Sequence, residues 1–194
     1  MSYYYQPVRW MMFIDGENFT IRSQKRAAGK GIKLEERFQA SFKRDVWFWP
    51  YPQNDPRSQC ETWTGQRVSS TAKMPLAIRC NYYTSTQGAS DEVDNVRDAI
   101  QEIGFAAHVF HKKKGMRAKG VDISLTKDLL MNAALDNYDS AILVAGDADF
   151  VPVVEEVQRL GKTISVAFFS EKESGMSPAL RRSADFFFNL DSIF

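Results

Sequence analysis

The sequence lacks several features that define whole classes of protein. Two cysteines among 194 residues rule out a disulfide-stapled scaffold, and no Cys-x-x-Cys pair indicates a zinc or redox site. No stretch approaches the roughly 18 consecutive apolar residues that a membrane span needs. The first residues also lack the charged and apolar regions of a signal peptide. We therefore expect a cytoplasmic protein with no membrane partner.

Neither sign of charge dominates the chain. There are 25 basic and 24 acidic side chains, so the formal net charge is +1. Binding of a polyanion would therefore depend on a local arrangement of charge rather than on a global field. No Gly-x-Gly-x-x-Gly follows the first apolar run, which argues against a dinucleotide cofactor. The length fits one domain over residues 1–194.

Apolar runs alternate with helical patterns along the chain. Short apolar runs predict strands at 8–14, 76–83, 105–110, 140–145, 163–169 and 186–188. Residues with helical spacing predict helices at 19–28, 34–42, 90–103, 122–135, around 153–160 and near 179–180. Strands separated by helices indicate an α/β fold, in which a mostly parallel sheet is covered on both faces.

One segment, at about 43–75, interrupts this alternation. It shows neither helical nor strand periodicity, and it holds several aromatic residues among four prolines. A long stretch without elements is usually functional or disordered, and the aromatics argue against simple disorder. Trp47, Phe48 and Trp49 either stack on unpaired bases or pack on the domain, and we favour packing.

Acidic residues follow two of the predicted strands. Asp15 ends the first strand, with Asn18 three residues later, and Asp147 and Asp149 follow the fourth strand. Asp122 opens the helix that leads into that fourth strand. Ligands bind beyond the carboxyl ends of parallel strands. If the first and fourth strands are neighbours in the sheet, these carboxylates can converge at one edge.

Such a cluster predicts a cation. Carboxylates held together repel one another unless protons or a cation neutralise them. Oxygen ligands from Asp and Asn favour Mg²⁺ or Mn²⁺ over zinc. Taken singly, Asp149 could be a helix N-cap and Asp147 a turn residue. Their shared position at strand ends favours a site.

Three motifs in this order resemble the NYN domain, the PIN-like nuclease family that includes LabA-type proteins. They are Phe13-Ile14-Asp15-Gly16-Glu17-Asn18, then Lys119-Gly120-Val121-Asp122-Ile123-Ser124-Leu125, then Ala145-Gly146-Asp147-Ala148-Asp149-Phe150-Val151-Pro152. The resemblance implies a three-layer α/β/α fold with a Rossmann-like central sheet and an acidic Mg²⁺ or Mn²⁺ site that cuts RNA in many members. It places metal-binding and catalytic roles on Asp15, Asp122, Asp147 and Asp149, with Asn18 in support. Ala145 stands where the family usually has Ser.

A basic stretch precedes Asp122 and is a candidate for binding substrate phosphates. It consists of Lys112, Lys113, Lys114, Arg117 and Lys119. Lys119 is favoured because it belongs to the matched motif, and a solvated loop is the alternative for the others.

We therefore predict a metal-dependent endoribonuclease acting on single-stranded RNA. The first alternative is an RNA-binding or regulatory NYN module without turnover. The second is another Mg²⁺ phosphoryl-transfer enzyme, such as a phosphatase, but those place Asp-x-Asp after the first strand and here it follows the fourth. A homo-oligomer is also considered, with Phe186 to Phe188 and Phe194 as a candidate surface, although core packing of these rings is favoured.

Overall fold

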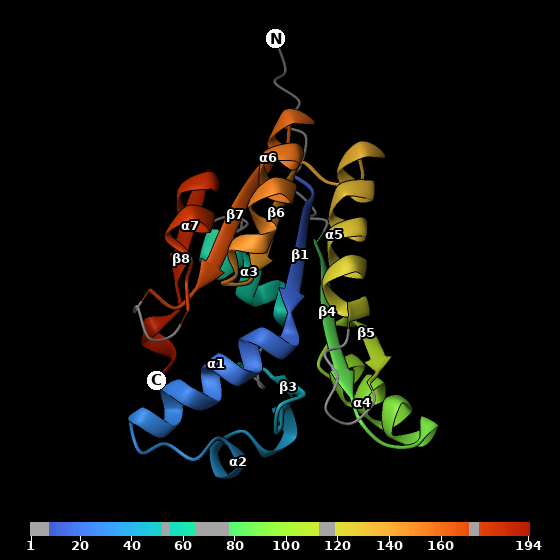
Figure 1. Cartoon of the computed structure of the whole chain (residues 1–194), viewed down its shortest axis with the longest axis vertical. Helices are drawn as coiled ribbons and strands as arrows, with labels where there is room; N and C mark the ends of the chain where they lie inside the picture. The colour runs from blue at the N-terminus through green and yellow to red at the C-terminus, as the bar shows by residue number, and fades with distance from the viewer. Residues whose placement is uncertain (1–7, 52–54, 65–77, 113–118, 171–174) are drawn as a thin grey trace, which may run out of the picture.

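The sheet of the computed structural model has six parallel strands in the order β5-β4-β1-β6-β7-β8 (Figure 1). The structure describes residues 8–51, 55–64, 78–112, 119–170 and 175–194. The strands are β1 Trp10–Asp15, β4 Ile78–Thr86, β5 Ala106–His111, β6 Ser140–Val144, β7 Thr163–Phe168 and β8 Phe186–Asn189. The predicted mostly parallel α/β sheet is confirmed.

Helices cover both faces of this sheet and make three layers. The helices are α1 Gly16–Gly29, α2 Leu34–Arg37, α3 Pro56–Thr64, α4 Ser90–Glu102, α5 Lys119–Ala134, α6 Val151–Arg159 and α7 Pro178–Ser183. One core joins α1, α2 and α4 to one face of β1, and a second joins α5, α6 and α7 to the other face. None of the described helices is long and apolar enough to cross a membrane.

The path of the chain creates a switch point beside β1. After β1 the chain builds β4 and β5 on one side, and it then returns to build β6, β7 and β8 on the other. β1 therefore pairs with both β4 and β6, and Ile14 lies opposite Val144. Ligands bind in the crevice at such a reversal, beyond the carboxyl ends of the strands. The assumed adjacency of the first and fourth predicted strands is thus correct.

Two glycines allow close packing around this switch point. A Cβ atom on Gly16 would lie 2.1 Å from the Tyr82 ring and 2.7 Å from the Tyr83 carbonyl oxygen. A Cβ atom on Gly146 would lie 2.5 Å from the Phe168 ring. Only glycine permits these approaches, so Gly16 and Gly146 set the positions of the chain turns that follow β1 and β6.

Two expectations for residues 34–75 were wrong. The helix predicted at 34–42 stops at Arg37, because buried Phe38 leaves helical geometry and its ring packs edge-on against Phe48, 5.1 Å away. A 3-10 turn, Gln39–Ser41, follows it.

The segment at 43–75 was predicted to lack regular elements, yet it contains α3. The signal for this helix was missed. Asp55 Oδ1 accepts a hydrogen bond from Arg57 N at 2.9 Å, and Pro56 is the first helical residue. Both features are typical of helix starts.

The aromatic residues of this segment belong to the core. Trp47, Phe48 and Trp49 are at most 3% exposed, and the short β2 Phe42–Lys43 pairs with β3 Trp47–Phe48. The Phe48 N–H donates to the Tyr82 hydroxyl oxygen at 3.0 Å. Packing, the favoured expectation for these rings, is confirmed.

The terminal phenylalanines have different environments. Phe194 stacks on Phe48 at 5.9 Å, whereas Phe186 on the edge strand β8 is 61% exposed. Core packing therefore holds for Phe194 but not for Phe186, and a homo-oligomer stays a prediction.

Candidate metal and nucleic-acid site

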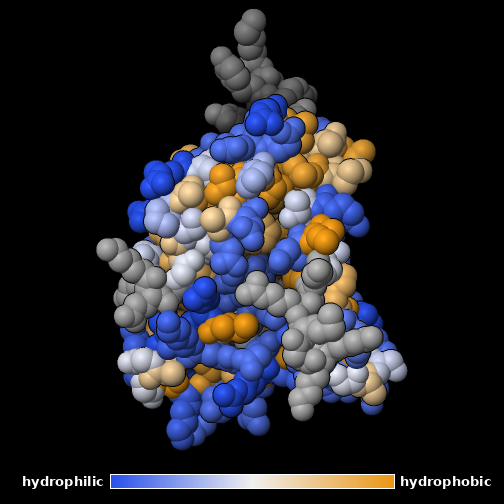
Figure 2. Space-filling view, in the orientation of Figure 1, coloured by the Kyte–Doolittle hydropathy of each residue, from blue (hydrophilic) through white to orange (hydrophobic). Residues whose placement is uncertain are grey.

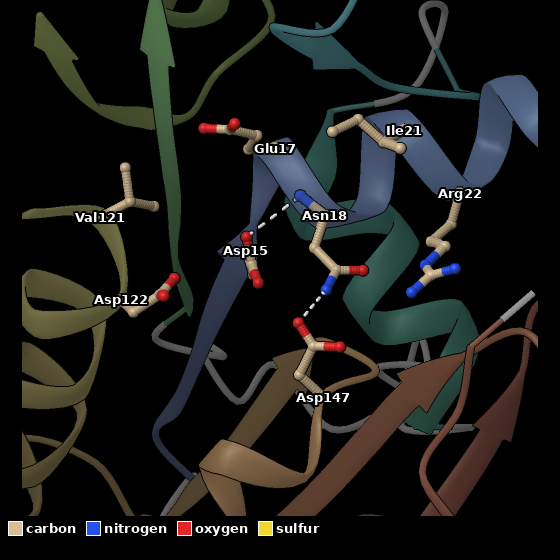
Figure 3. Close-up of a pocket in the computed structure, with 8 residues that line it drawn as sticks. All are labelled: Asp15, Glu17, Asn18, Ile21, Arg22, Val121, Asp122 and Asp147. Atoms are coloured by element: carbon tan, nitrogen blue, oxygen red, sulfur yellow. Dashed lines mark hydrogen bonds between the residues drawn. The ribbon is translucent and has the colours of Figure 1, made fainter. Parts of the chain in front are cut away.

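An open cavity of about 370 Å³ lies at the carboxyl ends of β1 and β6. Its described lining comes from three parts of the chain: the start of α1, the first turn of α5 and the loop after β6 (Figure 3). The lining residues are Asp15, Glu17, Asn18, Ile21, Arg22, Val121, Asp122 and Asp147.

Asp15 lies at the base of this cavity and also caps α1. Its carboxylate accepts a hydrogen bond from Asn18 N at 3.2 Å, which satisfies one of the open donors of the helix N-terminus. The residue is only 4% exposed. Burial, with the negative charge of Asp122 as the next cause, raises the pKa of Asp15 to about 8 despite the lowering effect of the Asn18 bond. The negative charges of Asp147 and Glu17 are smaller causes of the same rise in pKa.

Asn18 connects two of the chain segments. Its amide nitrogen Nδ2 donates to Asp147 Oδ2, while its backbone binds Asp15 (Figure 3). The amide oxygen Oδ1 is buried and has no hydrogen-bond partner among the described residues. Asn18 thus lies between the two carboxylates, and its supporting role stays a prediction.

Asp122 reaches the cavity from α5. It is exposed in the first turn of that helix, and its neighbour Val121 is 3% exposed and packs in the core. Val121 anchors this turn, and Figure 3 shows the Asp122 carboxylate directed toward the end of β1. The effect of Asp122 on the pKa of Asp15 is consistent with their proximity.

Asp149 does not line the cavity. It is exposed within the 3-10 turn Ala148–Phe150. Nor does it cap α6, whose N-cap is Phe150 without a side-chain hydrogen bond. The structure thus brings Asp15, Asp122 and Asp147 together, and the role of Asp149 stays a prediction.

Sequence reasoning assigned no role to Glu17. One of its carboxylate oxygens forms an ion pair with Lys112 Nζ at 2.8 Å, and the other accepts a hydrogen bond from the Ser85 hydroxyl. The signal was its place in the first turn after Asp15, where acidic residues also favour the helix dipole. Lys112 is therefore engaged by the site itself.

The other basic candidates have no described side chain. Lys113, Lys114 and Arg117 lie outside the described residues, and only the backbone of Lys119 is described, as the first residue of α5. Their role in binding substrate stays a prediction.

The arrangement can hold a divalent cation with few direct protein ligands. Among the described residues, no group of three or more His, Cys, Asp or Glu side chains is placed to share one metal ion. Mg²⁺ commonly takes one or two carboxylates and keeps its remaining positions for water and phosphate oxygens. The all-oxygen donors, the unpartnered Asn18 Oδ1 and the raised pKa of Asp15 fit such a cation.

Comparisons with known proteins identify the family. A search of curated proteins gives no significant match to the chain. The crystal structure of a protein of unknown function from Vibrio parahaemolyticus matches with a TM-score of 0.61 and 19% identity, over 100% of this chain and 99% of that chain. At this identity the likeness shows the three-layer fold alone. The sequence model of the NYN domain matches residues 9–191. The chain therefore belongs to the NYN domain family of the PIN-like nuclease superfamily, whose members generally use divalent metal ions to act on nucleic acids.

Proposed function

We propose that the protein is a metal-dependent endoribonuclease that hydrolyses phosphodiester bonds of single-stranded RNA with Mg²⁺ or Mn²⁺. The observation that carries this proposal is the meeting of Asp15, Asp122 and Asp147 at one open cavity. Burying Asp15 beside other carboxylates is energetically unfavourable, since burial first and the charge of Asp122 second raise its pKa. A bound divalent cation would neutralise these carboxylates and would attract the phosphate of a substrate.

Asp15, Asp122 and Asp147 would surround the metal, with one or two of them as direct ligands, and Asp149 would contribute negative charge from outside the cavity lining. A divalent cation supplies activation of water and stabilisation of the leaving oxygen in an in-line displacement. Asn18 fixes the Asp147 carboxylate and, through its backbone, the Asp15 carboxylate. Both groups are therefore oriented before substrate arrives, which reduces the cost of reorganisation during the reaction.

Glu17 is the fourth acidic residue of the cavity, and it differs from the three aspartates because its carboxylate forms an ion pair. Lys112 and Ser85 hold its carboxylate, so its charge is already balanced in the protein. We assign Glu17 to positioning Lys112 beside the cavity. Lys113, Lys114, Arg117 and Lys119 are proposed to continue this basic side toward the phosphates of the substrate.

The deciding experiment is incubation of purified protein with end-labelled single-stranded RNA in Mg²⁺, in Mn²⁺ and in EDTA. We expect cleavage in metal, none in EDTA, and a loss of at least about 100-fold in Asp147→Asn. Asp98→Asn, a change of the same type at an exposed position of α4, is the matched control. A parallel single-stranded DNA substrate tests the preference for RNA. Equal cleavage by wild type, Asp15→Asn and Asp147→Asn would exclude the proposed site.

A second candidate is an RNA-binding module without turnover. The same experiment separates the two functions, because a module binds the labelled RNA tightly but leaves it intact in both metals.

A further inference from the structure

Arg22 gives the acidic cavity one positive wall. It lies four residues after Asn18 on α1 and so shares a helix face with it. Among the described residues that line the cavity, Arg22 is the only cation, against Asp15, Glu17, Asp122 and Asp147. Figure 3 shows Glu17 and Arg22 on opposite sides of Asn18, with the Arg22 guanidinium on the side away from Val121.

Arg22 is half-buried, yet its guanidinium makes no stabilising polar contact with the described residues. Within the part of the chain that the structure describes, no hydrogen bond or ion pair joins it to another residue. Arg26, one turn further along α1, contrasts with it: its side chain is 4% exposed and pairs with Asp191 at 3.2 Å. Lys112, on the other side of the cavity, pairs with Glu17. Arg22 is therefore the cation whose donors remain for a ligand.

The backbone at Gly175 lies close to the Arg22 guanidinium. Gly175 has a φ of +95°, and a Cβ atom built on it would lie 2.8 Å from both Cζ and Nε of Arg22. This backbone segment is fixed to the end of β6, because Ser177 N donates to the Gly146 carbonyl oxygen at 2.8 Å. Residues 175–177 therefore contact both the loop that carries Asp147 and the Arg22 side chain.

Ile21 adds an apolar surface beside this cation. It lines the same cavity and is 42% exposed, so it offers an aliphatic surface in a region of the molecule that is otherwise largely hydrophilic (Figure 2). A free inorganic anion gains nothing from such a neighbour. A nucleotide gains from both residues, since its phosphate suits the guanidinium fork and its sugar or base can cover the aliphatic side chain.

We propose that Arg22 and Ile21 form a nucleotide subsite next to the metal site, in which Arg22 binds the phosphate that neighbours the scissile one. The proposal rests on the function proposed above and extends it. The three aspartates are negatively charged, so by themselves they do not bind the phosphates of the substrate strand. The proposal also predicts that the strand crosses the cavity from the basic side of Lys112 to Arg22.

The test measures binding separately from cleavage. A short fluorescein-labelled single-stranded RNA is titrated with full-length protein in Ca²⁺ at several salt concentrations, and gel analysis verifies that the probe stays intact. We expect Arg22→Gln to raise Kd about tenfold and to reduce the slope of log Kd against log salt by about 0.7, the share of one phosphate contact on a single strand. Arg22→Lys keeps the charge, so it should retain most of the slope. Arg79→Gln removes an exposed arginine from the opposite end of the sheet and should bind like wild type.

Competition identifies the ligand class. A nucleoside monophosphate should displace the probe at lower concentration than inorganic phosphate does, and Ile21→Ala should remove that difference. Equal competition by both would mean a simple anion site and would overturn the nucleotide assignment. Unchanged affinity and salt slope in a folded Arg22→Gln would overturn the subsite altogether. If that variant does not fold, the same result in Arg22→Met, which removes the charge but keeps an aliphatic side chain of similar length, would do so.

The outcomes keep this proposal separate from the nuclease proposal. A protein that binds RNA through Arg22 but never cuts it refutes the nuclease and leaves the subsite. A protein that cuts RNA in Mg²⁺ with no effect of Arg22→Gln on binding or cleavage refutes only the subsite.

Discussion

Replacing Asp15 by Asn should stabilise the metal-free protein while removing its response to metal. Asn is as good an N-cap as Asp, so the start of α1 is kept. The substitution removes a buried carboxylate that lies near three other acidic side chains. The predicted increase in the free energy of unfolding therefore measures how much the buried Asp15 carboxylate destabilises the protein when no cation is bound.

The size and the pH dependence follow from the pKa of Asp15. This pKa rises from 3.8 to about 8 on folding, so the folded protein holds the proton more tightly than the unfolded chain does. The contribution of Asp15 to stability is thus most favourable below pH 4 and is lost as the pH rises from 4 through 8. At roughly 1.4 kcal/mol for each pH unit, the cost at pH 7 is up to about 4 kcal/mol. Relaxation and water entry reduce such costs, and we expect about 2 to 4 kcal/mol.

Urea denaturation in EDTA at pH 4, 6 and 8 measures this effect. Asp15→Asn should equal wild type in free energy of unfolding at pH 4 and exceed it increasingly toward pH 8, whereas Asp98→Asn should follow wild type throughout. Added Mn²⁺ should then stabilise wild type more than Asp15→Asn. A variant that is no more stable than wild type at pH 8 in EDTA would refute the electrostatic argument.

The remaining predictions concern packing and the division of roles among the acids. Gly16→Ala should lower the free energy of unfolding by about 1 to 3 kcal/mol, because the added Cβ has no room beside Tyr82. Gly29→Ala, where a Cβ meets open space, should be close to neutral, and thermal melts compare the two variants. Phe48→Ala should cost about 3 to 5 kcal/mol in urea denaturation, since its fully buried ring contacts several other rings, and a loss below 1 kcal/mol would contradict its place in the core. In RNA cleavage, Asp147→Asn should lose at least tenfold more rate than Asp149→Asn, because only Asp147 lines the cavity; equal losses would show that Asp149 contributes as much.

The sequence predicts the sheet well because parallel strands are buried on both faces. β1 and β6 are short apolar runs with every residue buried. As the pattern indicated, β1 ends at Asp15 and β6 ends just before the loop that carries Asp147. The motif order also indicates that Asp15 and Asp147 share an edge. That prediction required β1 and β6 to be neighbours, a long-range pairing that local patterns do not contain.

Features that depend on tertiary contacts were harder to predict. α3 was missed because the aromatic and proline content of its surroundings conceals a nine-residue helix that buries one side against β4. Arg22 was missed because a single basic residue on a helix is usually solvated. Its significance comes from Gly175, which is more than 150 positions away in the sequence and leaves room for the guanidinium. A search at helical spacing from Asn18 would have found Arg22 as a candidate.

The most direct test of the account is a metal-specificity switch at Asp147. Asp147→Cys replaces a hard oxygen ligand by a thiolate, which favours softer metal ions. The native thiols Cys60 and Cys80 are buried and should not compete, and Asp98→Cys controls for an added surface thiol. We predict that Asp147→Cys cuts single-stranded RNA at least about 100-fold more slowly than wild type in Mg²⁺, and that Cd²⁺ restores its rate at least tenfold with no such effect on Asp98→Cys. Wild-type cleavage by Asp147→Cys in Mg²⁺ would contradict the claim that this carboxylate holds the catalytic metal.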